Sequence, residues 1–186
     1  MKKIILASAS PRRKELMKNI TSDFSAIASL KEEDLPQNIE AEKAPLYLAE
    51  QKAQDIFSSH PDCIVIGCDT VVIIDDKILG KPKTSRDAYD MLSKLSGNTH
   101  KVITGCCILS KDKKKIFSSQ TLVKFYPLCD DEIYKYIDSG DCFDKAGAYG
   151  IQSASMLFVE RIEGDFFNVV GLPVARLKRE LEKFLY

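Results

Sequence analysis

The feature that most constrains the fold is an apolar run of eleven residues, from Ile64 to Ile74, which contains one charged residue. A near-continuous run of this kind, rich in Ile and Val, is typical of a strand buried on both faces of a sheet. The charged residue, Asp69, lies in the middle of the run. A buried carboxylate is costly, so Asp69 must be paired, hydrogen-bonded, metal-bound or protonated.

The other elements predicted from hydrophobic periodicity surround this strand. Further strands are predicted at 2–8, 100–110, 115–127 and 156–162, and helices at 11–19, 45–58, 84–96 and 131–138 and from Pro173 onward. The polar segment 29–38 is predicted to be a loop. Helices and strands alternate without a strict strand–helix–strand period, which indicates an α/β fold with a mixed sheet. We expect one domain over residues 1–186, with either one core or two small lobes that share a cleft.

Composition argues against several classes of protein. The 27 basic and 27 acidic residues balance, so we expect neither a nucleic-acid nor a membrane partner. No stretch approaches the roughly 20 apolar residues that a membrane span needs, and the N-terminal apolar run is too short for a signal peptide. The six cysteines include no C-x-x-C pair, and only two histidines are present. We therefore expect reduced, buried thiols in a cytoplasmic protein.

Two adjacent arginines occupy the start of the first predicted helix. Ser10 as N-cap and Pro11 at the first helical position make a good helix start. Arg12 and Arg13 then place cations where the helix dipole favours anions, at a cost of roughly 0.3–1 kcal/mol each. With the hydroxyls of Ser8 and Ser10 and free backbone N–H groups, this start predicts an anion site suited to phosphate. The alternative is that both guanidiniums point into water.

Three more charged residues are conspicuous where they stand in the sequence. Lys52 falls in the middle of the apolar face of its helix, so it either reaches solvent along the core or points at a shared anion. Asp69 is a candidate general base or metal ligand, or an aspartate bonded to backbone at a bulge. Lys81 follows a turn and could supply a further cation, although turn lysines are usually solvated.

The stretch from Asp141 to Gln152 combines charges with two glycines, which imply sharp turns near a ligand or a plain loop. Asp144 and Lys145 form either a local ion pair or part of a site, and the Gln152 amide could read the edge of a base. The chain offers cations and carboxylates but no Ser-His-Asp arrangement. The residues therefore favour metal-assisted phosphoryl chemistry on a phosphorylated small molecule.

Seven short motifs occur in an order shared with a known family. They are SASPRR (8–13), LAEQKA (48–53), GCDTV (67–71), GKP (80–82), LSGNTHKVITG (95–105), DKAGAYGIQ (144–152) and GDFFNVVGLP (164–173). The chain thereby resembles the Maf nucleoside triphosphate pyrophosphatases along essentially its whole length. The DKAGAYGIQ string resembles the branch that acts on dTTP and UTP, and the branch that acts on N7-methyl-GTP is the second choice.

The resemblance implies an elongated α/β domain whose two lobes enclose a cleft, related to the inosine triphosphate pyrophosphatase fold and often a homodimer. It implies hydrolysis of a nucleoside triphosphate between the α- and β-phosphates, with Mg²⁺ or Mn²⁺, as a house-cleaning reaction. The family is also linked to septum inhibition and cell-division arrest. A non-catalytic nucleotide-binding regulator is therefore the alternative of another class.

The resemblance also implies roles for individual residues. Asp69 matches the proton acceptor, and Glu33 with Asp69 would hold the metal. Lys52 and Lys81, counted with Asp69 as catalytic, would complete the clamp on the phosphates. The residues implied to contact the substrate are Ser8, Ser10, Arg12, Arg13, Thr70, Asp144, Lys145 and Gln152. Of these, Arg12, Thr70 and Gln152 match positions associated with substrate specificity. One departure from the family pattern is Ser153, where a glycine often follows the glutamine.

Overall fold

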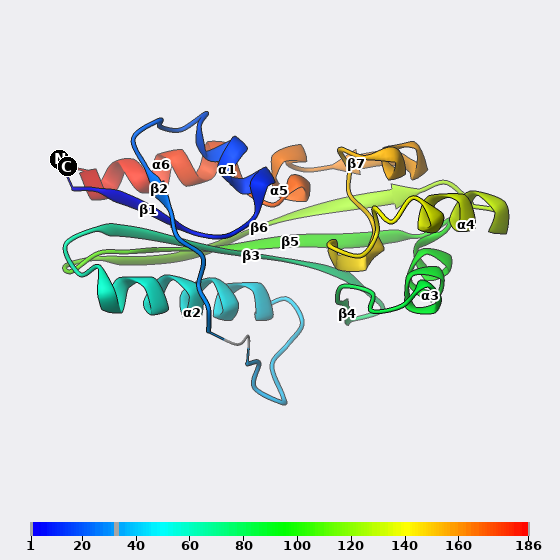
Figure 1. The fold of residues 1–186 in the computed structure, drawn as a ribbon, viewed down its shortest axis with the longest axis horizontal. Helices are drawn as coiled ribbons and strands as arrows, with labels where there is room; N and C mark the ends of the chain where they lie inside the picture. Colours follow the sequence, from blue (N-terminus) through cyan, green and yellow to red (C-terminus); the bar gives the residue numbers. More distant parts are fainter. Residues whose placement is uncertain (1, 32–33, 186) are drawn as a thin grey trace. The chain divides into compact units, whose positions relative to one another are not determined.

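The computed structural model describes residues 2–31 and 34–185, and within them the strands form one mixed sheet (Figure 1). The strands are β1 (Ile4–Ala7), β2 (Ser25–Ala26), β3 (Ile64–Ile74), β4 (Lys77–Leu79), β5 (Thr99–Leu109), β6 (Lys114–Phe125) and β7 (Val159–Glu163). Their order is β2-β1-β3-β5-β6-β7, and β4 pairs with β3 outside that path. The predicted α/β class with a mixed sheet is therefore confirmed.

The helices are α1 (Pro11–Met17), α2 (Ala44–Ser59), α3 (Ser85–Leu95), α4 (Asp130–Asp138), α5 (Phe166–Val170) and α6 (Val174–Leu185). Two short 3₁₀ turns lie at Ala146–Ala148 and Ala154–Phe158. None of the helices in the described part of the chain has the length and hydropathy needed to cross a membrane.

The described residues form two compact units. Unit 1 is made of the described parts of Met1–Thr70, Thr104–Ser119 and Gly171–Tyr186, and unit 2 of Val71–Ile103 and Gln120–Val170. The single domain over residues 1–186 and the cleft between two lobes stay predictions.

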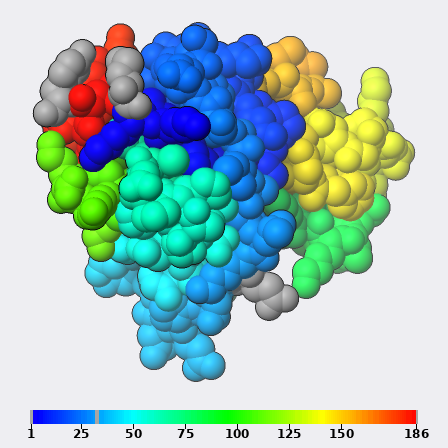
Figure 2. Space-filling model, turned by 60° about the vertical axis from the view of Figure 1, so that its left-hand side comes forward, coloured from blue at the N-terminus to red at the C-terminus, as the bar shows by residue number. Residues whose placement is uncertain are grey.

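In unit 1, β1 pairs in parallel with β3 from Ile4 opposite Ile64 to Ala7 opposite Gly67. Helix α2 lies along one side of these strands, and α6 lies along the other (Figure 1). A cluster of apolar side chains joins α2 to the strands: Ile5, Ala7, Ala49, Ala53, Ile56, Val65, Cys107 and Leu109. Residues 34–43, between β2 and α2, form the light-blue projection at the lower edge of the space-filling view (Figure 2).

Two glycines let α2 approach the sheet closely. A Cβ atom on Gly67 would lie 2.1 Å from the carbonyl oxygen of Ala49, and one on Gly105 would lie 2.2 Å from that of Pro45. Real Cβ atoms cannot come so near to backbone, so only glycine fits at either position. The contact brings the side chains of α2 within reach of β3.

Unit 2 has its own core. Its cluster includes residues of α3 and α4 together with Phe125, Tyr149 and Phe158. Helix α3 begins with the predicted capping box, in which Thr84 and Asp87 bond each other's backbone N–H groups.

Several short elements differ from the predictions. Strands β2 and β4 and helix α5 were not predicted, and the last strand begins at Val159 because the residues before it form a 3₁₀ turn. All six cysteines are free, as predicted, but they are not all buried: Cys129 is exposed and Cys63 is half-buried.

Candidate functional site

The start of α1 confirms the predicted helix signal and corrects one detail. The Ser10 hydroxyl accepts the N–H of Arg13 at 3.4 Å, and the Ser8 hydroxyl accepts the N–H of Ser10 at 3.2 Å. The prediction invoked free backbone N–H groups for the anion without naming them; the N–H groups of Ser10 and Arg13 are not among them, because the serine side chains already bind both. The helix has only seven residues, so we attribute any attraction for an anion here to the arginines rather than to the helix dipole.

The guanidinium of Arg13 is held by protein groups on two sides. Its Nε donates to the carbonyl oxygen of Gly171 at 2.9 Å, and its Nη2 donates to the Thr70 hydroxyl at 2.9 Å. The Thr70 hydroxyl also bonds the Thr104 hydroxyl, at 2.9 Å, across β3 and β5. The alternative in which both arginines point into water is therefore wrong for Arg13. Arg12 beside it is half-buried.

Lys52 and Asp69, the two charged residues found in apolar surroundings, form an ion pair with each other. The Lys52 ammonium lies 2.5 Å from Asp69 Oδ1, and only 17% and 11% of the two side chains are exposed. Neither residue matches its structural alternative, a lysine that extends to water or an aspartate bonded only to backbone. Since burying an unpaired charge is costly, the ion pair explains how each residue is tolerated in an apolar setting.

The Lys52–Asp69 pair and the Arg13–Thr70 pair lie on opposite faces of β3, because successive side chains of a strand alternate. Asp69 faces α2, and Thr70 faces Arg13. The buried thiol of Cys68, the residue before Asp69, is affected by the charges of both Arg13 and Lys52. A hydrogen bond with Cys106 lowers the pKa of Cys68, burial raises it, and the charges of Arg13 and Lys52 lower it further. Unit 1 therefore gathers three of the predicted charged residues around the middle of β3.

The predicted metal ligands are only partly within the described residues. Glu33 lies outside them, and among residues 2–31 and 34–185 no three His, Cys, Asp or Glu side chains are grouped as a metal site. Mg²⁺ is usually bound by one or two carboxylates together with water and substrate phosphates, so a three-residue cage is not required. Asp69 fits that kind of site by its chemistry, since its carboxylate oxygens are hard ligands.

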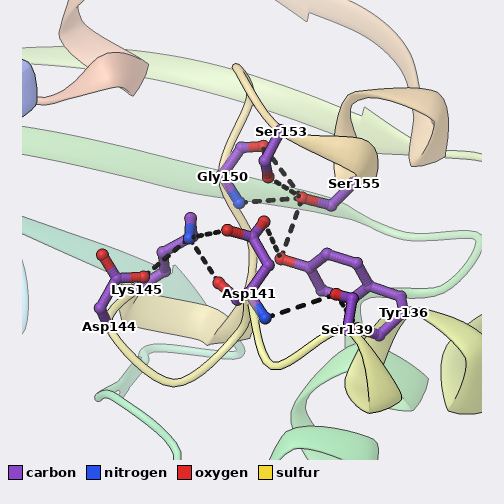
Figure 3. A network of polar contacts seen from close by, with 8 residues as sticks. All are labelled: Tyr136, Ser139, Asp141, Asp144, Lys145, Gly150, Ser153 and Ser155. Atoms are coloured by element: carbon purple, nitrogen blue, oxygen red, sulfur yellow. Dashed lines mark hydrogen bonds and ion pairs between the residues drawn. The ribbon is translucent and has the colours of Figure 1, made fainter.

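Unit 2 contains the other predicted group, centred on Lys145 (Figure 3). The Lys145 side chain is only 6% exposed, and its ammonium lies 2.7 Å from both Asp141 Oδ1 and Asp144 Oδ1. It also donates to the carbonyl oxygen of Asp141. The Asp144–Lys145 ion pair was foreseen, whereas Asp141 was not among the predicted site residues. The sequence held no clear signal for it, because a spacing of four residues brings side chains together on a helix and this segment is a turn.

The environment of Asp141 favours its charged form. Burial alone would raise the pKa of Asp141, but the hydrogen bonds from Lys145 and Ser153 and the charge of Lys145 outweigh it and leave the pKa lowered. Asp141 therefore serves as an ionised counter-charge to Lys145.

The remaining predicted residues, Lys81 and Gln152, are exposed. Lys81 makes no ion pair with any residue of the described part of the chain. Its neighbour Gly80 accepts the N–H of Gly147 at 3.0 Å, which joins the GKP motif to the DKAGAYGIQ motif. The roles predicted for these side chains toward a substrate stay predictions.

A fold and a family follow from comparison with known proteins. The fold is similar to that of a HAM1 protein from Coxiella burnetii, with a TM-score of 0.52 and 12% identity over 98% of this chain and all of the other. That likeness supports the predicted fold relationship and no more. The chain belongs to the Maf-like protein family, whose model matches residues 3–184.

Two relatives cover nearly all of the chain and carry the same name. A dTTP/UTP pyrophosphatase from Bacillus velezensis is 49% identical over 98% of this chain and 97% of its own length. A dTTP/UTP pyrophosphatase from Carboxydothermus hydrogenoformans is 48% identical over 99% of this chain and 100% of its own. The predicted family resemblance is confirmed.

Proposed function

We propose that this chain hydrolyses nucleoside triphosphates, with dTTP and UTP preferred, to the nucleoside monophosphate and pyrophosphate. The observation that carries the proposal is the 49% identity, over almost the full length of both chains, to a protein named dTTP/UTP pyrophosphatase. House-cleaning of non-standard nucleotides and a contribution to cell-division arrest are the roles that such an activity would serve.

Asp69 is the general base of the proposed reaction. It accepts a proton from the water that attacks the α-phosphorus. Lys52 holds one carboxylate oxygen of Asp69 at 2.5 Å, so the orientation of the base is fixed before substrate arrives. A base that is positioned in this way typically contributes a factor of about 10²–10⁴ to the rate.

The phosphates are bound by the basic groups. A guanidinium carries five N–H donors, and the bonds to Gly171 and Thr70 use two of those of Arg13. The others can donate to phosphate oxygens from a guanidinium that is already oriented, which reduces the entropy lost on binding. Arg12 and Lys81 supply further positive charge, and Ser8 and Ser10 have hydroxyl protons to donate. Lys145, whose charge is balanced by Asp141 and Asp144, would take part together with these carboxylates.

A divalent cation, Mg²⁺ or Mn²⁺, belongs to the proposal. Asp69 and Glu33 are the residues that would hold it, and when bound it would neutralise charge on the phosphate oxygens. Gln152 and Thr70 recognise the pyrimidine ring of the nucleotide. If Gln152→Ala leaves the preference for pyrimidine nucleotides unchanged, the role of Gln152 in recognition is wrong.

The test is pyrophosphate release from a panel of nucleotides, with Mg²⁺ or Mn²⁺ and with EDTA. We expect release from dTTP and UTP, its loss with EDTA, and a rate about 10²–10⁴-fold lower in Asp69→Asn. The matched control is Asp62→Asn, the same chemical change at an exposed position. Near wild-type turnover in Asp69→Asn would refute the assignment of the base.

Other outcomes of the panel separate the alternatives. A preference for N7-methyl-GTP would place the chain in that branch of the family. No release from any nucleotide with either metal would contradict the proposed reaction and favour a nucleotide-binding regulator of septum formation. A cytoplasmic homodimer is part of the same proposal, and light scattering of the purified protein tests its dimeric state.

A further inference from the structure

A continuous chain of hydrogen bonds in unit 2 joins the backbone of Gly150 to the ammonium of Lys145 (Figure 3). The N–H of Gly150 donates to the Ser155 hydroxyl at 3.0 Å, and Ser155 donates to the Tyr136 hydroxyl at 3.2 Å. Tyr136 then donates to Asp141 Oδ2 at 3.3 Å. The other oxygen of Asp141 accepts from Lys145 at 2.7 Å.

The direction of this chain follows from counting protons. Asp141 is ionised and can only accept, so the Tyr136 hydroxyl must donate to it. The Tyr136 oxygen can then only accept a hydrogen bond, and the Ser155 hydroxyl lies 3.2 Å from it. The carbonyl oxygen of Gly150 lies 2.9 Å from the Ser153 hydroxyl, which donates to it. The Ser155 hydroxyl also lies 2.9 Å from the same carbonyl oxygen and 3.0 Å from the hydroxyl of Ser153, the residue that departs from the family pattern. Ser155 is thus tied to the N–H and to the carbonyl of Gly150 as well as to Tyr136.

This series of hydrogen bonds is buried. In such a setting each hydrogen bond is stronger, and the loss of a partner costs more free energy. Ser155 is completely buried, and Tyr136 is 4% exposed. A Cβ atom on Gly150 would lie 2.7 Å from the side-chain carbons of Lys145. The stem of Lys145 therefore packs directly against Gly150, which places the turn in contact with the lysine.

We propose that Tyr136 and Ser155 are positioning residues that fix the turn from Gly150 to Gln152 against Lys145, and so set the selectivity of Gln152 for pyrimidine nucleotides. This inference rests on the proposed function. Both residues are buried, so they would act on a substrate through Gln152. Gln152 is exposed and follows Gly150 by two residues, so its direction depends on how firmly that turn is held.

The variant that tests the inference is Tyr136→Phe, which removes the hydroxyl and keeps the ring, whose centroid is 5.3 Å from that of Phe158. We expect the ratio of kcat/KM for dTTP over that for dATP to fall about tenfold. This corresponds to about 1.4 kcal/mol, which is close to the lower limit of about 1.5 kcal/mol for a hydrogen bond to a charged group. The matched control is Tyr134→Phe on the same helix, where the ring is 52% exposed; it should leave the ratio unchanged.

Two further measurements separate positioning from a merely structural effect. In a Gln152→Ala background, Tyr136→Phe should not change the ratio further, because the residue acts through Gln152. Hydrogen exchange of the Gly150 amide should be faster in both Tyr136→Phe and Ser155→Ala, although Tyr136 does not bond that amide.

The inference is overturned if Tyr136→Phe leaves both the ratio and the exchange rate at their wild-type values, or if it lowers the ratio equally in the Gln152→Ala background. Failure of the proposed function gives a different result, because the wild-type protein would then release no pyrophosphate. The exchange rate of the Gly150 amide would still report whether the hydrogen-bond chain exists.

Discussion

His100 is expected to make the fold sensitive to acid. It is 2% exposed, and its ring packs against those of Phe125 and Tyr149 at 5.1 and 5.3 Å. Nε2 lies 2.7 Å from the Tyr149 hydroxyl, and Nδ1 has no hydrogen-bond partner among the described residues. Burial lowers the pKa of His100 from 6.5 to about 4, because a charged imidazole would lose its hydration there.

The sign and size of the effect follow from these two pKa values. The pKa in the folded state is below that in the unfolded state, so the unfolded chain binds the proton first. The stability contributed by a neutral His100 is complete above a pH of 6.5 and is lost as the pH falls toward about 4. At 1.36 kcal/mol per pH unit, the full loss is about 3 kcal/mol, and about 2 kcal/mol of it has occurred at about pH 5.

The assay is urea unfolding at about pH 7.5 and about pH 5 for the wild type and His100→Gln. The loss of unfolding free energy between the two pH values should be about 2 kcal/mol larger in the wild type, because carboxylates titrate in both proteins. His60→Gln, which keeps His100, is the control and should behave as the wild type does. Equal losses in the wild type and His100→Gln would refute the reasoning.

Two predictions concern the packing of α2 against β3. Lys52→Met removes the ammonium beside the buried carboxylate of Asp69, and the unfolding free energy measured in urea should fall by about 3 kcal/mol. Asp69→Asn in the Lys52→Met background should recover part of this loss. A Lys52→Met protein as stable as the wild type would contradict the role of the ion pair. Gly67→Ala should cost about 1–3 kcal/mol by overpacking against the helix backbone. Gly80→Ala, whose Cβ atom would have nothing within 4 Å, is its control; equal thermal stability of the two variants would contradict the close approach of α2.

The larger part of the fold was predictable because its signals are local. The N-cap Ser10, the capping box at Thr84 and the helix stop at Gly97 each act within a few residues, and the structure confirms all three. Strand β2 has two residues and exists because β1 offers it a partner. Strand β4 follows a turn in which Asp75 and Asp76 have positive φ angles. The turn was foreseen, but a three-residue strand has no periodicity of its own.

The site was predictable residue by residue but not pair by pair. Lys52 and Asp69 were both recognised as anomalous, and two buried opposite charges in one small protein could have been matched to each other. What joins them is the register of α2 on β3, which depends on Gly67 and is a tertiary property. The bond from Arg13 to the Gly171 carbonyl spans 158 residues and has no local signal at all.

That bond has a consequence for how the protein is made. The carbonyl that fixes the guanidinium of Arg13 is synthesised 158 residues after Arg13 itself. Unit 1 is assembled from three separate stretches of chain. Strand β1 can pair with β2 and β3 soon after it is made, but Arg13 is fixed only when the third stretch has begun. Contacts of such long range slow folding and leave apolar surface exposed in the nascent chain. A chain that stalls before Gly171 therefore lacks the group that orients Arg13, even if all of unit 2 has already folded.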